Sequence, residues 1–276
     1  MHSHSQKALK DCIDTSKPGK NELSFWWLGQ HGFVIKTDGT VIYFDPFLSD
    51  HPGRLLPPPL APLDLDNADL ILGSHDHVDH IDRKAWSEIK ENKNKAIFIV
   101  PEAVRENLID ELKLEKKDII GLNDSQCIEV GKIKVFAIAA AHEFLDCDPK
   151  TGHFPYLGYI IKINDFTIYH SGDTCIYEGM STKLRNWKID VAFLPVNGRD
   201  AERLSCGCIG NMTYQEAADL AGVLKPGLTV PGHYGMFKKN TINPDLFKDY
   251  MAVKYPQLKT CLCEPGKESH YPVKNF

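Results

Sequence analysis

The segment His75-Asp76-His77-Val78-Asp79-His80 places three histidines and two aspartates within six consecutive residues. Imidazole nitrogens and carboxylate oxygens are common protein ligands of divalent metal ions. If the segment is extended, His75 and His77 share one face and can bind one ion, while the following residues reach a second ion where the chain turns. Burying these groups without a cation would cost on the order of several kcal/mol. The segment therefore predicts a metal centre and not a polar loop that caps the next helix.

A hexapeptide cannot saturate two ions, so further ligands must come from other strand ends. His142, Asp173 and His233 each follow a short apolar run, at 135–141, 167–169 and 228–230. Each of them alone also fits a polar cap of a strand end. Together with the hexapeptide they predict one ligand set for two divalent cations per chain. Alternation along 167–170 predicts instead that His170 is buried in the core.

Short apolar runs separated by glycine and aspartate predict the strands that carry these residues. The expected strands cover 25–28, 33–35, 41–44, 70–72, 97–100, 133–139, 159–163, 167–169, 191–195, 228–230 and 259–263. Asp38-Gly39 predicts a hairpin turn. Helices are expected over 83–93, 102–112, 214–224 and 244–253, the first after an N-cap at Asp82. Two strand-rich halves that each bring helices predict an α+β fold with two facing sheets covered by helices.

The polar character of residues 1–22 predicts a tail or an element added at the edge of the fold. Residues 23–276 are expected to form one compact domain. The proline-rich stretch 54–62 predicts a surface loop, because proline lacks the backbone donor that a central strand needs.

Composition and charge narrow the class of protein. The chain has 276 residues, of which 42% are hydrophobic and 25% charged, as in ordinary globular domains. A net charge of −5 gives no overall attraction for nucleic acid, so a nucleic-acid partner is not expected. The sequence contains no apolar run long enough to span a bilayer and no secretory signal. These features predict a cytoplasmic protein without a membrane partner.

The eight cysteines are expected to be mostly free thiols, because a chain of this size buries a core without disulfide bonds. The pairs Cys206/Cys208 and Cys261/Cys263 raise the alternative of a four-thiolate zinc site. Only one residue separates the members of each pair, whereas two to four usually separate such ligands. The spacing therefore argues against that site.

The candidate ligands also occur in a recognisable order. Asp45 follows an apolar run, the pattern H-x-H-x-D-H comes next at 75–80, and a histidine, an aspartate and a histidine come later. This order resembles the metallo-β-lactamase-fold superfamily over residues 24–263. The resemblance implies an αββα sandwich with a dinuclear metal site at one edge between the sheets. It places His75, His77 and His142 on one metal, Asp79, His80 and His233 on the other, Asp173 between them, and Asp45 behind a ligand histidine.

A narrower resemblance rests on the segments 27–30, 56–59, 194–200 and 209–213, which read WLGQ, LPPP, LPVNGRD and IGNMT. These segments are similar to the L-ascorbate-6-phosphate lactonase (UlaG-like) branch. The resemblance implies that a hydroxide bound to two metals opens a phosphorylated sugar lactone, such as L-ascorbate 6-phosphate. It favours Mn²⁺, although imidazole and carboxylate ligands also accommodate Zn²⁺ or Fe.

The expected substrate contacts follow from this interpretation. Arg199, directly after a strand end, is the first candidate for the anionic group of a small phosphorylated metabolite. Its pairing with Asp200 or Glu202 on a solvated loop is the alternative. Further candidates are Arg54 and Tyr234 for substrate binding, and Asp79 and Asn197 for catalysis, the latter as a donor to a developing oxyanion.

Two other classes of function stay open from the sequence. Related metallo-β-lactamase folds include nucleases, so a metal-dependent phosphodiesterase or RNA-processing nuclease is the alternative, and it needs a basic surface beside the metals. A metal-stabilised interaction domain without catalysis needs closed metal coordination. The sequence also leaves open whether the chain forms a homo-oligomer.

Overall fold

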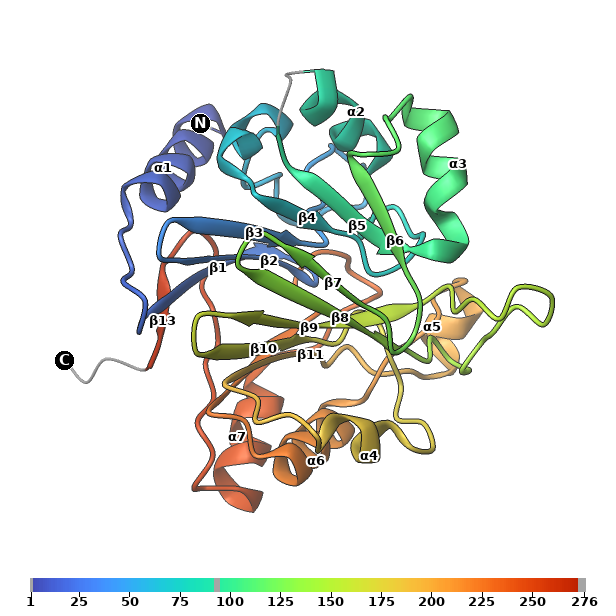
Figure 1. Cartoon of the computed structure of the whole chain (residues 1–276). Coiled ribbons are helices and arrows are strands. Elements are labelled where there is room, and N and C mark those ends of the chain that lie inside the picture. Colours follow the sequence, from blue (N-terminus) through green and yellow to red (C-terminus); the bar gives the residue numbers. More distant parts are fainter. Residues whose placement is uncertain (1, 92–94, 273–276) are drawn as a thin grey trace.

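Two β-sheets face each other across a central core, and helices cover the outer surface of each sheet (Figure 1). The computed structural model describes residues 2–91 and 95–272. The first sheet contains β1 (Leu23–Gly29), β2 (Gly32–Thr37), β3 (Thr40–Phe44), β4 (Leu70–Leu72), β5 (Ile97–Pro101), β6 (Ile119–Leu122) and β13 (Ser269–Tyr271). The second contains β7 (Cys127–Val130), β8 (Ile133–Ala139), β9 (Leu157–Ile163), β10 (Phe166–His170), β11 (Val191–Pro195) and β12 (Leu228–Gly232). The expected αββα sandwich of the α+β class is confirmed.

Both sheets mix parallel and antiparallel pairs. The strand order is β13-β1-β2-β3-β4-β5-β6 in the first sheet and β12-β11-β10-β9-β8-β7 in the second. Strands β3 to β6 are parallel, and so are β10 to β12. Parallel neighbours end at the same edge of a sheet, so residues that follow β3, β4, β10 and β12 can meet there.

The helices form the two outer layers of the sandwich (Figure 1). Helices α1 (His2–Thr15), α2 (Arg83–Glu91) and α3 (Glu102–Leu112) cover the first sheet, and α4 (Met180–Leu184), α6 (Tyr214–Leu224) and α7 (Asp245–Lys254) cover the second. The short helices η1 (Pro62–Asn67) and α5 (Ala201–Ser205) lie in connections between strands. The N-terminal segment expected as a tail or edge element contains α1, whose Leu9 and Ile13 are buried against the first sheet.

The central strands are apolar on both faces because one face of each sheet packs against the other sheet and the opposite face packs against helices. In β1, Phe25 and Trp27 belong to the core between the sheets, whereas Trp26 and Leu28 belong to the core under α1 and α2. Successive strand residues point to opposite faces, so both faces need apolar side chains. This arrangement explains the continuous apolar runs that mark the strands in the sequence.

Local signals predicted several elements correctly. Asp38 and Gly39, with φ of 47° and 76°, form the two-residue turn that joins β2 to β3. Asp82 Oδ1 accepts a hydrogen bond from Ala85 N at 3.1 Å and so caps α2. The predicted bounds of α3 and α6 agree with the structure. Positions 92–93, expected to end α2, lie outside the described residues.

The predicted closing strand at 259–263 is wrong. Within that stretch only Thr260 makes a bridge, to Thr229 of β12. The last strand is instead β13, which pairs with β1 at the edge of the first sheet. Among the described residues, no helix is both long and apolar enough to cross a membrane.

Candidate metal centre

Side chains that follow several strands meet at one edge of the sandwich. The 75–80 segment follows β4, His142 follows β8, Asp173 follows β10 and His233 follows β12. Asp45 follows β3, the neighbour of β4. Residues far apart in the sequence therefore reach one site because the strands that precede them end at the same edge.

The 75–80 segment is a turn and not an extended strand, which corrects the expected conformation. His80 N and Ile81 N both donate to His77 O, at 3.0 and 2.8 Å. The turn still brings two imidazoles together, because His75 Nε2 lies 2.9 Å from His77 Nδ1. The predicted pairing of these histidines is thus reached by a different backbone path.

The structure brings all seven predicted ligands together. Three overlapping groups have ligand atoms within 4.8 Å of one another: His75, His77 and His142; His75, His80 and Asp173; and Asp79, His80 and His233. Asp173 Oδ2 lies 3.0 Å from His233 Nε2, and Asp173 Oδ1 lies 3.5 Å from His80 Nε2. Asp173 also shares one group with His75 and His80, which the resemblance assigns to different metals, so its position suits the predicted bridge.

Burial and neighbouring charges together set the protonation of these side chains. Loss of water lowers the pKa of His142 to about 4, and burial also lowers the pKa of His75 and His77. A neutral imidazole has the lone pair that a metal ion needs. Burial opposes ionisation of Asp79 and Asp173, but the nearby histidines lower the pKa of both carboxyl groups. His75, His77 and His142 are thus held neutral, while Asp79 and Asp173 are held ionised.

The residues present fit divalent cations. Although burial disfavours its charged form, the neighbouring carboxylates of Asp173, Asp45 and Asp79 raise the pKa of His80 well above the ordinary value. His80 Nε2 and Asp173 Oδ1 are buried and have no hydrogen-bond partner in the part of the chain that the structure describes. Unpaired polar atoms inside a protein call for an ion or a water molecule. A donor set of nitrogen and oxygen suits Mn²⁺, Zn²⁺ or Fe.

Comparisons with known proteins agree with this geometry. The profile of the family described as "Beta-lactamase superfamily domain" matches residues 40–234, which include every predicted ligand. A UPF0173 metal-dependent hydrolase of Myxococcus xanthus is 30% identical over 256 residues, covering 90% of this chain and 82% of that protein. The chain belongs to the UPF0173 metal-dependent hydrolases of the β-lactamase superfamily.

Two further comparisons extend over nearly the whole hydrolase. A UPF0173 metal-dependent hydrolase of Caldivirga maquilingensis is 28% identical over 253 residues, which cover 90% of this chain and 98% of that protein. The solved structure of Igni18, a metallo hydrolase from Ignicoccus hospitalis, has a TM-score of 0.69 and 23% identity, and the match covers 92% of this chain and 100% of that chain. The Igni18 comparison shows that the two chains share a fold.

Asp45 holds the ligand His80 in place through hydrogen bonds. Its Oδ2 accepts hydrogen bonds from His80 Nδ1 and from Ser74 Oγ, each at 2.7 Å, and its Oδ1 accepts from Ser74 N at 2.7 Å. A proton held on His80 Nδ1 leaves Nε2 free to face a metal. The predicted role of Asp45, orienting a ligand histidine, is consistent with these contacts.

The Asp45→Asn variant of the hydrolase is expected to bind metal about 10- to 100-fold more weakly. Asparagine has the same shape and tolerates the positive φ of 44° at this position. Both oxygens of Asp45 accept hydrogen bonds in the native protein, so the NH₂ group of asparagine would face a donor and one hydrogen bond would be lost. Metal titration of the purified variant measures the effect. Wild-type affinity in the variant would contradict the orienting role.

Sequence reasoning missed Gln30 and His31 as residues of this centre. Gln30 Nε2 donates to Asp79 Oδ2 at 2.9 Å, and Gln30 O accepts from His233 N at 2.6 Å. The His31 ring is fully buried, 4.2 Å from the ring of His170 and 6.2 Å from that of His233. The sequence feature that could have identified them is a pair of polar residues between Gly29 and Gly32, with an apolar run on each side.

Backbone constraints fix the ends of the strands that carry the ligands. Gln30, Asp45 and His233 all have positive φ, of 51°, 44° and 60°, a conformation that is uncommon for non-glycine residues. Gly232 must be glycine because a Cβ there would lie 2.3 Å from His31 Nδ1. The tight contact between β12 and the β1–β2 connection therefore sets the position of His233.

A pocket of about 260 Å³ opens beside the ligands. Its lining includes His77, Val78, Asp79, His142, Asp173, Gly207, Cys208, Ile209, His233 and Asn240. Asn197, the expected oxyanion donor, does not line it: Asn197 is 0% exposed and its Nδ2 donates to Asn240 Oδ1. Tyr234 does not line it either, because its ring stacks on Trp27 with centroids 4.6 Å apart.

Arg199 lies in a neighbouring hollow that shares Cys208 and Ile209 with the metal pocket. Its two terminal nitrogens donate to the two carboxylate oxygens of Glu216, at 2.6 and 2.7 Å. The partner is therefore Glu216 on α6, and neither Asp200 nor Glu202, which the sequence suggested as alternatives. A bidentate pair of this kind holds the guanidinium firmly in place.

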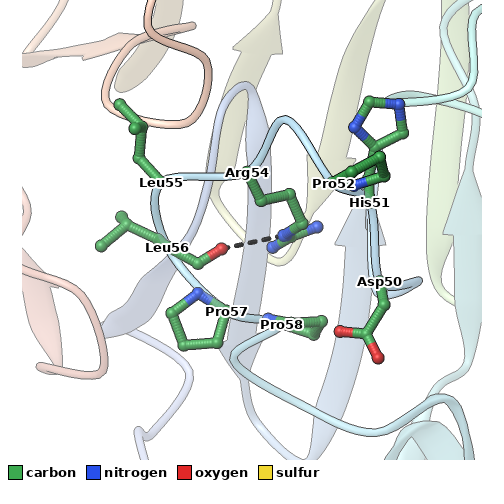
Figure 2. Close-up of a pocket in the computed structure, with 8 residues that line it drawn as sticks. All are labelled: Asp50, His51, Pro52, Arg54, Leu55, Leu56, Pro57 and Pro58. Carbon is green, nitrogen blue, oxygen red and sulfur yellow. Dashed lines mark hydrogen bonds between the residues drawn. The ribbon is translucent and has the colours of Figure 1, made fainter.

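Arg54 lines a different cavity of about 460 Å³, formed by residues 50–52 and 54–58 (Figure 2). Its Nε donates to Leu56 O at 2.9 Å, its Nη1 donates to Phe47 O at 3.0 Å, and its guanidinium lies 4.6 Å from the centre of the Phe47 ring. None of the predicted metal ligands lines this cavity. Arg54 holds the proline-rich loop together and does not reach the metal pocket.

The remaining candidates behave as structural residues. His170 is fully buried, donates from Nε2 to His31 O at 2.9 Å and stacks on Phe44, as expected of a core histidine. All eight cysteines are free, which confirms the expected thiols. None of the metal-binding groups found among the described residues contains cysteine, so the four-thiolate alternative has no support.

Proposed function

We propose that this metal-dependent hydrolase opens a small lactone or cleaves a small ester, and that the reacting part of the substrate carries no charge. The pocket beside the ligands carries this proposal: it measures about 260 Å³, and neither lysine nor arginine is among the described residues that line it. The two cations alone would balance one phosphodiester, but a nucleic acid also needs a basic surface for its neighbouring phosphates, whereas a carbonyl group needs one or two neutral donors. The pocket therefore favours a carbonyl substrate over the phosphodiesterase or nuclease alternative.

The chain's own residues prepare this chemistry in three ways. The seven histidine and aspartate ligands would hold two divalent cations, and such cations make a bound water acidic and polarise a carbonyl oxygen. Asp79 lines the pocket, and Gln30 Nε2 fixes its Oδ2 so that the ionised carboxylate can accept a hydrogen bond from the attacking water. Burial of His75, His80 and Asp173 keeps bulk water away from the ligand atoms.

The more specific substrate, a phosphorylated sugar lactone, requires a cation for its phosphate. Arg199 stays the candidate for this contact, but it must leave Glu216 or accept the phosphate beside that pair. The geometry supports a neutral lactone better, because the carboxylate of Glu216 already balances the charge of Arg199.

The Arg199→Ala variant is expected to change kcat/KM for a neutral lactone less than about threefold. It is also expected to lower the free energy of unfolding by no more than about 1 kcal/mol, because the ion pair that it removes is partly exposed. Steady-state kinetics and denaturant unfolding measure the two effects. A ten- to hundredfold loss restricted to phosphorylated lactones would instead favour the phosphorylated substrate.

A substrate screen tests the proposal directly. The enzyme is loaded in turn with Mn²⁺, Zn²⁺ and Fe²⁺ and then given neutral lactones, their phosphorylated counterparts, simple esters and a phosphodiester. We expect lactones or esters to be hydrolysed, and we expect Mn²⁺ or Zn²⁺ to support the highest rate. Turnover of the phosphodiester alone would overturn the proposal.

A further inference from the structure

A chain of side-chain amides connects the ligand His142 to Asn240, another residue that lines the metal pocket. His142 Nδ1 donates to Asn211 Oδ1 at 3.1 Å. Asn211 Nδ2 donates to Asn197 Oδ1 at 3.1 Å, and Asn197 Nδ2 donates to Asn240 Oδ1 at 2.7 Å. Asn197 and Asn211 are fully buried, whereas Asn240 lines the pocket. The three amides thus lead from a metal ligand back to the space where a substrate fits.

The direction of this chain follows from His142. A histidine that binds metal through Nε2 carries its proton on Nδ1, so Asn211 must present its oxygen to that proton. Each amide that accepts through its oxygen has its nitrogen left to donate to the next one. Asn240 consequently accepts through its oxygen from Asn197 and keeps Nδ2 for the pocket. Across the described residues, no group accepts a hydrogen bond from Asn240 Nδ2.

The backbone holds the two inner amides in this arrangement. Gly198 N donates to Met212 O at 3.0 Å, and Asn211 N donates to Gly198 O at 3.2 Å. A bridge between Asn197 and Thr213 continues this pairing up to the start of α6. Reversal of either buried amide would set two donors or two acceptors against each other and leave buried polar atoms unpaired. The orientation of Asn240 is therefore imposed from the metal side.

We infer that Asn240 binds an oxygen acceptor of the substrate, namely the carbonyl oxygen of the lactone or ester and the carboxylate of its product. Asn197 and Asn211 are positioning residues that make the Asn240 amide present N–H and not C=O to the pocket. The inference rests on the proposed function and names the residue that recognises its substrate. A pocket without lysine or arginine in its described lining needs a neutral donor of this kind.

The first test replaces only the group that faces the pocket. Asn240→Asp keeps the shape and the oxygen that accepts from Asn197, but it replaces the pocket-facing N–H donor with an acceptor. With γ-butyrolactone as the neutral lactone, we expect kcat/KM to fall about 10- to 100-fold while the metal content stays at two per chain. Asn186→Asp, the same change at an exposed turn residue, serves as the control and should stay within about twofold of wild type.

A second test measures binding without turnover. The product of γ-butyrolactone hydrolysis, 4-hydroxybutyrate, is titrated into the metal-loaded wild type and into Asn240→Leu, which removes the donor without adding a charge. We expect the dissociation constant to rise at least about fivefold in the variant. Equal affinities in the two proteins would overturn the inference.

A third test examines the positioning role of Asn197 with single and double variants. Asn197→Ala frees Asn240 to turn, so it should lower kcat/KM for the lactone about as much as Asn240→Ala does. The kcat/KM of the double variant should then be no lower than that of the less active single variant, because both changes remove the same hydrogen bond from Asn240 to the substrate. Additive losses, or loss of metal in either single variant, would show that the asparagines only stabilise the site and would overturn the inference.

The two proposals fail in different ways. If the wild type hydrolyses no lactone or ester but binds 4-hydroxybutyrate through Asn240, the proposed function is wrong and the binding role stands. If the wild type hydrolyses the lactone and Asn240→Asp matches it, the binding role is wrong and the proposed function stands.

Discussion

The Asp173→Asn variant is expected to bind less than one equivalent of metal per chain and to lose about a thousandfold in kcat/KM. Asp173 is almost fully buried, and its carboxylate lies within 4.8 Å of ligand atoms of His75 and His80, which belong to the two predicted metal-ligand groups. An amide offers one oxygen and no charge, so it cannot serve both groups. Elemental analysis of the variant after dialysis against a fixed metal concentration measures the occupancy.

Asp165→Asn is the matched control for this experiment, because Asp165 lies exposed in the turn between β9 and β10. The control is expected to keep both metals and wild-type kinetics. Two tightly bound metals in Asp173→Asn would rule out a bridging carboxylate. Loss of a single metal with the other unchanged would assign Asp173 to one position only.

Removal of the metals by a chelator is expected to abolish activity and to lower the stability of the folded protein. Ions that bind only the native state stabilise it by about 4 kcal/mol for each site when the free metal exceeds its dissociation constant a thousandfold. The buried carboxylates and the raised pKa of His80 show how much charge the site gathers in a small volume. Denaturant unfolding with and without chelator, together with elemental analysis, measures the change.

Addition of Mn²⁺ or Zn²⁺ to the stripped protein should restore both activity and stability, which separates metal loss from irreversible unfolding. Full activity in protein that retains less than about a tenth of an equivalent of metal would contradict the metal-dependent mechanism. Restored stability without restored activity would point to a structural metal and support the interaction-domain alternative.

Elements with local signals were predicted well. The hairpin at Asp38-Gly39 and the helix after Asp82 depend on residues within a few positions of each other. The Thr213 capping box with Glu216 likewise starts α6 where the sequence places it. The closing strand was misplaced because pairing of β13 with β1 joins opposite ends of the chain, and three half-buried residues carry no clear periodicity.

The sequence by itself determined the chemistry of the centre, because the ligands His75, His77, Asp79 and His80 form a dense local motif and the other three follow apolar runs. The tertiary structure decided which side chains reach the substrate. Arg199 pairs with Glu216 and Asn197 lies behind Asn240, and these contacts join segments whose proximity no local pattern records. Ligands at strand ends can be predicted because sheet topology brings those ends together. The hydrogen-bond partner of a single surface arginine or a buried amide depends on which segment packs beside it in the tertiary structure.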